Sequence, residues 1–537
     1  MRSRIFMSMF TGAALLVGTL LGAGTARSAD VPAEFGTDWH DPVTAAPPVT
    51  VPAHDRSCEV TVAEARFKDF TPYRGTYTPP AACGTTWSKV VLRLDGKVKG
   101  RQFDRLGHLR IGGVEVLRTS TPQPSPDGIE WSVEKDVTRY VETLRTTQPV
   151  EMLIGNVVDD TYTGILDVKA TLTFYRGRPD ARTAATIPDR VLTLRDDDHT
   201  LTTPRNSERV VAEVYATGSG GGCEEYWYLT VPAGAPYSCT ADEGPYREVR
   251  IAVDGQLAGI AAPFPNVWTG GWSNPFLWYV VPGPRAFDVQ PLRYDLTPFA
   301  GLLNDGRPHR IEVSVVGVPE GRTGWSTPVN VLVWQDEGSE RVTGALTKAE
   351  AGGLTGSSLY TPGAEHRVDT RGGDRLTVAG YVDTSHGRVT TTVRRSLAHT
   401  STHTWADGEN PDALDARWSD DETVTVDGRG PARTTRVQRS YTMDGTTTLG
   451  AGDRLRTVLT LGDRARTTEL WGGRRTAWSR LDDTYTGDAT YTANVPRDQR
   501  HAVGTTGERY RRYGSDGCYD RSLVSVQGVL TEDRMGC

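Results

Sequence analysis

The sequence predicts an all-β protein in which two consecutive jelly-roll β-sandwiches are followed by a further antiparallel β-domain. Three observations lead to this prediction. Short runs rich in β-branched and aromatic residues, bounded by Gly, Pro, Asp or Asn, recur along the chain. The pattern of these runs repeats within the first two thirds of the sequence. The composition then changes near residue 345, where Thr, Arg, Asp and Gly become frequent.

The first 29 residues are expected to form a secretory signal peptide rather than a buried helix. A basic start is followed by an apolar run to about Leu21 and by small residues, with cleavage expected after Ala26 or Ala29. Residues 30–56 then form an N-terminal extension. No other stretch has the ~20 apolar residues that a membrane span needs. We therefore expect a secreted (extracellular) protein without a membrane span, and the excess of Arg over Lys is typical of a GC-rich bacterial genome.

The internal repeat defines the two sandwiches. The first, over residues 57–178, contains the strand-like runs WSKVVLRLDG, VEMLIGNVV and DVKATLTFY. The second, over residues 206–340, contains REVRIAVDG, RIEVSVVGV and VNVLVW in the same order. In each copy one strand ends in Asp-Gly, and an Asp-x-Thr turn then precedes a short helix-like segment, VTRYVETL or LTPFAGLL. Each copy has the length of a jelly roll of about eight strands.

Residues 345–537 alternate polar and apolar side chains, as in TTTVRRSLAHTSTHTW. This alternation predicts long strands of an antiparallel sheet with one face in water. His399 and His403 are expected at the surface, because their spacing presents no pair of metal ligands on a strand. Since no chemistry is visible in this domain, we expect residues up to about 342 to suffice for catalysis.

Six cysteines in an exported chain predict disulfides, for which local pairing is the simplest arrangement: Cys58 with Cys83, Cys223 with Cys239, and Cys518 with Cys537. The sequence has no CxxC or HExxH motif, P-loop, Rossmann fingerprint or GxSxG elbow, so no metal or cofactor is implied. A net charge of −7 over 537 residues, without a basic patch, argues against nucleic acid as a partner.

One stretch of the first sandwich is unusually charged for a β-strand. In GRQFDRLGHLRIGGVEVLRTST, Asp104 and Arg105 are adjacent, and Glu115 and Arg118 follow. By itself, an adjacent Asp and Arg on a strand is most simply a surface ion pair of small energetic value.

A second stretch, GSGGGCEEYWYLTV, joins a Gly-rich loop to two acids, Glu224 and Glu225, and to an aromatic segment. We expect this segment to be a strand. Neighbouring side chains on a strand point to opposite faces, so only one of the two acids can face a given site.

A third stretch, FPNVWTGGWSNPFLWYVV, concentrates Trp and Asn residues. Trp rings stack on sugar rings and Asn amides bond hydroxyl groups, so the stretch favours a carbohydrate-binding loop. Packing in a core or an interface is the alternative for each Trp. The residues proposed to bind carbohydrate are Trp268, Trp272, Asn274 and Trp278.

Several long segments resemble the peptide-N-glycosidase A family, the peptide-N4-(N-acetyl-β-glucosaminyl)asparagine amidases. These include FDRLGHLRIGGVEVLRTSTPQPSPDGIEWSVEKDVTRY, GNVVDDTYTG, EEYWY, WTGGWSNPFLW and FDVQPLRYDLTPFAGLLNDGRPHRIEV. The resemblance covers roughly residues 57–340 and keeps the family's order. It implies hydrolysis of the Asn side-chain amide bond to N-acetylglucosamine.

A fainter resemblance to the bacterial peptide-N-glycosidase F group implies roles for individual residues. That group has two jelly rolls with the active site between them. Its aromatic-Asp-Arg strand corresponds to Phe103-Asp104-Arg105, which implies that Asp104 is the main catalytic residue. Its Gly-Cys-x-Glu-aromatic segment makes Glu225 the second catalytic acid.

The same resemblance leaves a third role open. The group's other Glu falls near Asn156, which is not an acid, so Asp159, Asp160 or Glu224 could take that role. Arg105 and Arg118 are the candidates for holding substrate oxygens. We thus expect Arg105, Arg118, Asn156 and Glu224 among the substrate-binding residues.

The predicted function is that of a secreted amidase that releases N-glycans from glycoproteins or glycopeptides and converts Asn to Asp. Asp104 would activate the attacking water. Glu225 would stabilise the tetrahedral oxyanion or protonate the leaving nitrogen. The alternatives are a glycoside hydrolase with two carboxylates and a non-catalytic glycan-binding sandwich. N-glycosylated proteins or peptides are the expected partners, and we expect a monomer.

Overall fold

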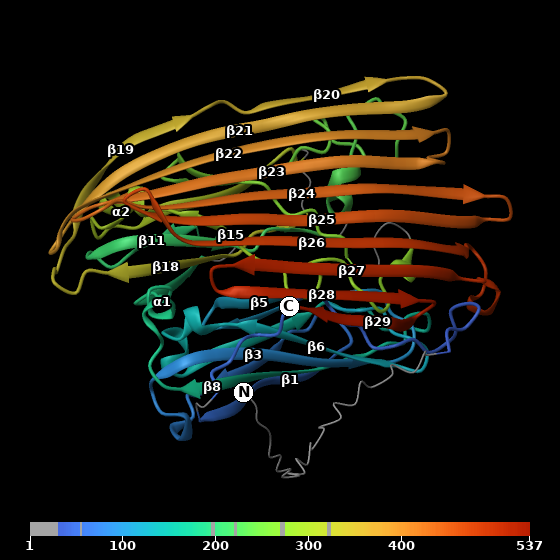
Figure 1. Ribbon diagram of the computed structural model, residues 1–537, viewed down its shortest axis with the longest axis horizontal. Helices are drawn as coiled ribbons and strands as arrows, with labels where there is room; N and C mark the ends of the chain where they lie inside the picture. Colours follow the sequence, from blue (N-terminus) through green and yellow to red (C-terminus); the bar gives the residue numbers. More distant parts are fainter. Residues whose placement is uncertain (1–29, 54–55, 195–198, 220–222, 269–273, 319–323) are drawn as a thin grey trace, which may run out of the picture.

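The computed structural model describes residues 30–53, 56–194, 199–219, 223–268, 274–318 and 324–537. The prediction of an all-β protein is confirmed, because antiparallel strands form almost the whole chain (Figure 1). The predicted signal peptide, residues 1–29, lies outside the described residues. The few helical turns are η1 (Ala81–Cys83), η2 (Thr138–Tyr140), η3 (Thr143–Arg145), α1 (Ala181–Ala184), η4 (Cys223–Leu229), η5 (Pro275–Leu277), η6 (Thr297–Phe299), α2 (Ala300–Leu303) and η7 (Arg497–Gln499).

The first sandwich consists of two four-stranded antiparallel sheets, ordered β1-β8-β3-β6 and β2-β7-β4-β5. Side chains of β8 are buried at every second position, as a strand with one face in a core requires. The strands are β1 (Ser57–Phe67), β2 (Tyr73–Tyr77), β3 (Trp87–Val98), β4 (Leu106–Ile111), β5 (Val114–Ser120), β6 (Ile129–Asp136), β7 (Gln148–Ile154) and β8 (Leu166–Arg176).

The second sandwich also has two four-stranded sheets, ordered β10-β16-β13-β14 and β15-β11-β18-β9, and it begins before residue 206. Its strands are β9 (Arg190–Leu194), β10 (Thr200–Leu201), β11 (Ser207–Val214), β13 (Glu248–Val253), β14 (Gln256–Ala261), β15 (Leu292–Asp295), β16 (His309–Val316) and β18 (Val329–Gln335). The short pair β12 (Thr217–Gly218) and β17 (Trp325–Ser326) lies beside them in the chain.

The two sandwiches share one topology. If the eight main strands of each are numbered in chain order, both have the order 1-8-3-6 in one sheet and 2-7-4-5 in the other. Both also carry short helical turns after the sixth strand, at the two segments expected to be helix-like. The internal repeat seen in the sequence therefore corresponds to a repeated architecture.

The two Asp-Gly pairs of the repeat behave differently. Asp254 and Gly255 have positive φ angles of 49° and 79° and form the turn between β13 and β14, as expected. In the first copy, β3 continues through Gly96 to Val98. A Cβ atom at Gly96 would lie 2.3 Å from the Trp131 ring, so this glycine is required by close packing within a strand.

The C-terminal part is one 11-stranded antiparallel sheet, called here the long sheet, in which β21 to β26 have 16 to 20 residues each. Its strands are β19 (Thr343–Ala351), β20 (Thr355–Thr361), β21 (Glu365–Thr384), β22 (Gly387–Ala406), β23 (Asp412–Asp427), β24 (Arg433–Gly450), β25 (Arg454–Trp471), β26 (Arg474–Thr492), β27 (Val503–Gly514), β28 (Gly517–Val526) and β29 (Val529–Gly536).

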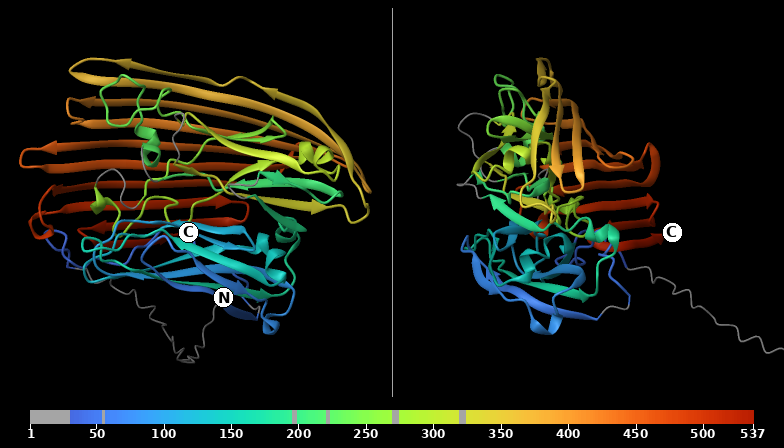
Figure 2. Two further views of the ribbon diagram at one scale, coloured as in Figure 1. Left: turned by 180° about the vertical axis from the view of Figure 1, so that it is seen from behind. Right: turned by 90° about the vertical axis from the view of Figure 1, so that its left-hand side faces the viewer.

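The long sheet covers one side of the second sandwich, and the first sandwich lies beside its β28–β29 edge (Figure 2). Its inward face shares a core with the second sandwich, where Val378 and Val393 pack in one cluster with Ile251. Further along, Tyr485 stacks on Trp278 with ring centroids 5.0 Å apart. The outward face carries the polar residues of the alternating pattern, so the sheet has one dry and one wet face, as the alternation predicts.

The expectation that His399 and His403 lie at the surface is wrong. Both are 2% exposed, because they belong to the inward-facing register of β22. His399 stacks on Trp418, with ring centroids 5.0 Å apart, and His403 Nε2 lies 2.7 Å from an oxygen of Asp412.

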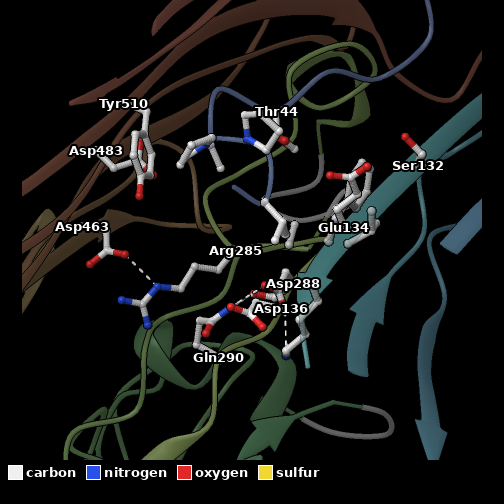
Figure 3. A pocket seen from close by; sticks show the side chains of 18 of the residues that line it. Thr44, Ser132, Glu134, Asp136, Arg285, Asp288, Gln290, Asp463, Asp483 and Tyr510 are labelled. Carbon is white, nitrogen blue, oxygen red and sulfur yellow. Dashed lines mark hydrogen bonds and ion pairs between the residues drawn. The ribbon is translucent and has the colours of Figure 1, made fainter. Parts of the chain in front are cut away.

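The N-terminal extension packs on the last strands of the long sheet. The Phe35 amide donates to the Ala502 carbonyl at 2.8 Å, and the His40 amide donates to the Gly528 carbonyl at 2.9 Å. Near its end the extension forms one wall of a cavity of about 790 Å³. The other walls come from the first sandwich, the segment around Arg285 and the long sheet (Figure 3).

The six cysteines pair locally, as predicted: Cys58 with Cys83, Cys223 with Cys239, and Cys518 with Cys537. Within the described residues, no helix has both the length and the apolar character needed to cross a bilayer.

Candidate active site

Asp104 lies in the loop between β3 and β4, at one end of the first sandwich. The loop is tied to the segment after β5, because the Arg105 amide donates to Thr121 Oγ1 at 2.9 Å and the Thr121 amide donates to the Arg105 carbonyl at 3.0 Å. The half-buried carboxylate of Asp104 accepts a hydrogen bond from Gln123 Nε2 at 3.3 Å. These contacts fix the position of Asp104 at this end of the first sandwich.

Arg105 is oriented by two amide side chains. Its Nε donates to Asn156 Oδ1 at 3.2 Å, and its Nη2 donates to Gln102 Oε1 at 2.5 Å. Burial lowers the pKa of the Arg105 guanidinium, and the neighbouring Asp104 carboxylate opposes this effect. The adjacent Asp and Arg are therefore not a free surface pair, since both belong to one hydrogen-bonded loop.

Asn156 does not have the expected role of contacting substrate. It is 0% exposed, and its Nδ2 donates to the carbonyls of Phe67, at 2.9 Å, and Gly164, at 3.1 Å. Its Oδ1 accepts from Arg105. A buried amide with all these partners positions the guanidinium and is closed to ligands.

Glu225 belongs to the 3-10 turn η4, not to the expected strand. The turn begins at Cys223, which is disulfide-bonded to Cys239, and it is kinked at Tyr226 (φ −119°, ψ 36°). Because a 3-10 helix has three residues per turn, the side chains of Glu224 and Glu225 point in different directions even without a strand.

The environment of Glu225 differs from that of an ordinary carboxyl group. Burial raises its pKa, the negative charge of Asp104 raises it further, and a hydrogen bond with Tyr226 partly opposes these effects. The charge of Asp104 reaches Glu225 although the two residues lie in different sandwiches. The structure therefore brings together the two acids that the sequence predicted to be catalytic.

Glu224 points into the second sandwich and is only 1% exposed. Arg247 forms a bidentate pair with it, with Nη2–Oε1 at 2.8 Å and Nε–Oε2 at 3.0 Å, and Trp325 Nε1 donates to Oε2 at 2.6 Å. Both oxygens of the Glu224 carboxylate therefore accept hydrogen bonds from within the protein. The expected roles of Glu224 as a substrate ligand or third acid are therefore not supported by its position.

Arg118 is likewise internal, contrary to its expected role of holding substrate oxygens. It is 2% exposed and pairs with Glu115 at 2.6 Å. Its Nη1 donates to the Tyr215 carbonyl at 3.0 Å and to Thr217 Oγ1 at 2.6 Å, both in the second sandwich. Arg118 thus joins the two sandwiches rather than binding a ligand.

In the described part of the proposed carbohydrate-binding loop, the three predicted residues are buried. Trp268, Asn274 and Trp278 are 5%, 0% and 1% exposed, respectively. Asn274 Nδ2 donates to the Ala489 carbonyl at 2.8 Å. The alternative of interface packing therefore describes these three residues, whereas Trp272 lies outside the described residues.

Three residues near the acids were not among the predicted site residues. Gln123 contacts Asp104, Tyr226 contacts Glu225, and Phe103 leaves 47% of its surface exposed beside Tyr162, with ring centroids 5.1 Å apart. Tyr226 and Phe103 directly adjoin the predicted acids in the sequence, and this adjacency could have indicated them. Gln123, in a Pro-rich segment, carries no such signal.

One group of described residues has the spacing of metal ligands: Glu208, Asp336 and His386. However, the Asp336 carboxylate already accepts hydrogen bonds from the Ser385 hydroxyl and amide, each at 2.6 Å, and from the Gly338 amide at 3.0 Å. Asp336 thus anchors the turn between β21 and β22.

Comparison with known proteins gives close relatives. A sequence model of the family described as peptide N-acetyl-beta-D-glucosaminyl asparaginase amidase A matches residues 47–352. Over 355 residues the chain is 32% identical to the peptide-N4-(N-acetyl-beta-glucosaminyl)asparagine amidase A of Prunus dulcis. That alignment covers 60% of this chain and 61% of the Prunus protein, so the chain spans about three fifths of its length.

Solved structures of PNGase F, a glycosylasparaginase from Flavobacterium meningosepticum, are also similar, with 13% identity and a TM-score of 0.36 over 52% of this chain and 96% of that one. PNGF-II has 14% identity and a TM-score of 0.35, over 52% of this chain and 66% of that one. Since the family match spans more than half of the 537 residues, the chain belongs to the peptide N-acetyl-β-D-glucosaminyl asparaginase amidase A family.

Proposed function

We propose that this protein is an amidase that hydrolyses the bond between the Asn side chain and N-acetylglucosamine, releasing N-glycans from glycoproteins or glycopeptides. The observation that carries the proposal is that Asp104, from the first sandwich, lies near enough to Glu225, from the second, for its charge to raise the pKa of Glu225. Membership of the amidase A family supports the same reaction.

The environments of the two acids differ, which suits one of them to act as a general base and the other as a general acid. Asp104 takes a proton from the attacking water, which adds to the side-chain carbonyl carbon of Asn. Glu225, whose raised pKa favours the protonated form, donates a proton to the departing nitrogen. The C–N bond breaks to give Asp in the peptide and a glycosylamine, which reacts with a second water to give free glycan and ammonia.

Charge on the tetrahedral oxygen also needs stabilisation, because it is the largest charge that develops during amide hydrolysis. Arg105 is the candidate for this role, since it adjoins Asp104 and is held by Asn156 and Gln102. The exposed ring of Phe103 offers an apolar surface for a sugar at the same loop.

Product analysis separates this proposal from its rivals. In water enriched in heavy oxygen, digestion of a defined glycopeptide should convert the glycosylated Asn to Asp and place the label in its carboxyl group. A glycoside hydrolase would leave Asn, or Asn bearing a sugar, and would label the glycan instead. A glycan-binding protein would give no product, and either of these two results would refute the amidase.

We further propose that the protein is bacterial, that it is exported and that it acts as a monomer on N-glycosylated proteins or peptides. The three disulfides support an oxidising compartment. The expected signal peptide is tested by N-terminal sequencing of the secreted protein, which should begin after Ala26 or Ala29. The molar mass measured by light scattering tests whether the protein is a monomer.

A further inference from the structure

A groove of about 610 Å³ is lined by residues of four strands of the long sheet, β23 to β26. Figure 1 shows these four strands side by side. It belongs to the outward face. Ser419, Ser440 and Arg464 lie in one cross-strand row, next to the inward row that contains Trp418 and Tyr441. Side chains of adjacent rows point to opposite faces of a sheet. The groove is thus separated from the candidate active site by the thickness of the sheet.

The groove is strongly basic. Five arginines and one acid, Asp421, line it. The arginines are Arg464, Arg466, Arg475 and Arg480, together with Arg439, which is the register partner of the buried Asp420 and therefore points to the inward face. Asp482, just outside this lining, partly neutralises them, with Arg464 Nε at 3.2 Å and Arg480 Nη2 at 3.9 Å.

The arrangement of these arginines is not one that folding favours. Arg466 on β25 and Arg480 on β26 are directly opposite partners in the strand register. Like charges in opposite positions destabilise a sheet, and both side chains are exposed. An anion between them would convert this repulsion into attraction, and guanidinium groups bind sulfate and carboxylate through paired hydrogen bonds.

Two aromatic side chains stand beside the arginines. Trp478 and Tyr513 are each 37% exposed, and Tyr513 is the register partner of Arg480 on β27. The Arg475 guanidinium lies 5.9 Å from the centre of the Trp478 ring. A simple inorganic anion has no use for exposed rings, whereas a sugar ring stacks on them.

We infer that this groove binds an anionic carbohydrate chain, one whose sugars carry sulfate or carboxylate groups. The arginines take the anionic groups, and Trp478 and Tyr513 take the apolar faces of the sugar rings. The inference does not depend on the proposed amidase reaction, because no residue of the groove belongs to the candidate active site. It gives the long sheet a binding role besides its structural one.

The test is binding of the full-length protein to sulfated dextran, polygalacturonate and neutral dextran by isothermal titration calorimetry. We expect the first, the second or both to bind, with affinity that falls as salt is added, and neutral dextran not to bind. Arg466→Gln with Arg480→Gln should weaken binding roughly tenfold or more. Absence of binding to both anionic polymers at low salt would overturn the inference.

Matched controls lie on the same face of the sheet. Arg417 and Arg456 are exposed but already pair with Asp415, at 3.4 Å, and Asp488, at 2.6 Å. Arg417→Gln with Arg456→Gln should leave binding nearly unchanged, and equal losses in both double variants would refute a localised groove. Circular dichroism checks that each variant is folded.

Trp478→Ala separates a sugar from a bare anion. It should weaken binding of the anionic polymer but leave binding of inorganic sulfate unchanged. If the polymer binds equally well to Trp478→Ala, the groove is a plain anion site and the carbohydrate assignment is wrong.

Discussion

Asp104 and Glu225 carry the same functional group in two different environments. Asp104 accepts a hydrogen bond from Gln123, whereas burial and the Asp104 charge raise the pKa of Glu225. Two carboxyl groups whose environments separate their proton affinities can act as a base and an acid at the same pH. The roles of the two residues are therefore set by their surroundings.

The first prediction is that Asp104→Asn and Glu225→Gln each lower kcat on a glycopeptide by about 10²–10⁴-fold, because each removes a group that transfers a proton. Glycopeptide binding and the thermal melt should stay nearly unchanged. As controls, Asp242→Asn and Glu243→Gln make the same chemical changes at exposed positions of the second sandwich. These two variants should leave kcat unchanged. Near-normal turnover in Asp104→Asn would remove it from the mechanism.

The second prediction concerns Tyr226, whose hydrogen bond lowers the pKa of Glu225. Tyr226→Phe removes that bond, so the pKa of Glu225 should rise. Activity that needs protonated Glu225 falls as pH increases through this pKa, so the alkaline limb of the pH profile of kcat/KM should move to higher pH. A shift to lower pH, or a loss of activity equal at every pH, would contradict the acid role of Glu225.

At the scale of elements, Glu225 is held in place because the adjacent residue, Glu224, anchors the turn η4. Glu224 is fixed by Arg247, which is 0% exposed, and by Trp325 in β17. The pair joins the turn to β13 and to the short β12–β17 sheet. One acid of the Glu-Glu sequence thus anchors the turn, and the other faces Asp104.

The third prediction follows from this anchoring. Glu224→Gln leaves the Arg247 guanidinium buried without a countercharge, which should cost roughly 3–5 kcal/mol of stability. Urea unfolding measures this loss, and Glu243→Gln is the exposed control. The folded fraction should keep a kcat close to normal. A large fall in kcat with unchanged stability would instead place Glu224 among the catalytic acids.

Periodicity predicted the elements well but not the burial of single residues. The strand runs, the two helix-like segments and the repeat match the structure because each depends on local pattern. The shared strand order 1-8-3-6 and 2-7-4-5 favours the jelly-roll connectivity, which stays a prediction. Residue type predicts Arg118 and Trp278 as ligands, and the resemblance predicts Asn156, yet contacts with other segments bury all three.

The long sheet explains why the sequence misled at Trp278 and at the two histidines. It begins more than 60 residues after Trp278, yet Tyr485 covers that ring. His399 and His403 are internal for the same reason, since a second sandwich lies against their face of the sheet. Such contacts between distant segments leave no local pattern, whereas adjacent residues such as Asp104 and Arg105 remain recognisable.

At the scale of the whole molecule, the two sandwiches and the long sheet share buried cores, so the chain packs as one unit rather than as three separate domains. The fourth prediction therefore reverses the expectation that residues up to 342 suffice. Truncation there removes Val378 and Val393 from the cluster that contains Ile251, and it removes Tyr485 from the Trp278 ring. We expect the truncated chain to aggregate or to lose its cooperative thermal melt. A soluble, cooperatively melting and active fragment would show that the long sheet is dispensable.

The last prediction concerns the cavity where the N-terminal extension meets the long sheet (Figure 3). Asp483 and Asp463 are opposite partners on β26 and β25, and Arg285 neutralises Asp463 at 2.7 Å. Asp483 instead shares a hydrogen bond with Glu508, whose Oε2 also accepts the Ala45 amide at 2.9 Å. Burial, together with the neighbouring acids, raises the pKa of Asp483. Burial raises that of Glu508 from 4.5 to about 7.

These raised values make the folded state bind protons more tightly than the unfolded state. The pair therefore stabilises the fold fully below the unfolded pKa values, and this contribution is lost as pH rises through about 7. Asp483→Asn removes one of the two buried charges, so its Tm should fall less than that of the wild type between mildly acidic and mildly alkaline pH. Thermal melts across that range decide the matter. Parallel Tm curves for the two proteins would mean that the pair does not share a proton and that the contact with Ala45 is insensitive to pH.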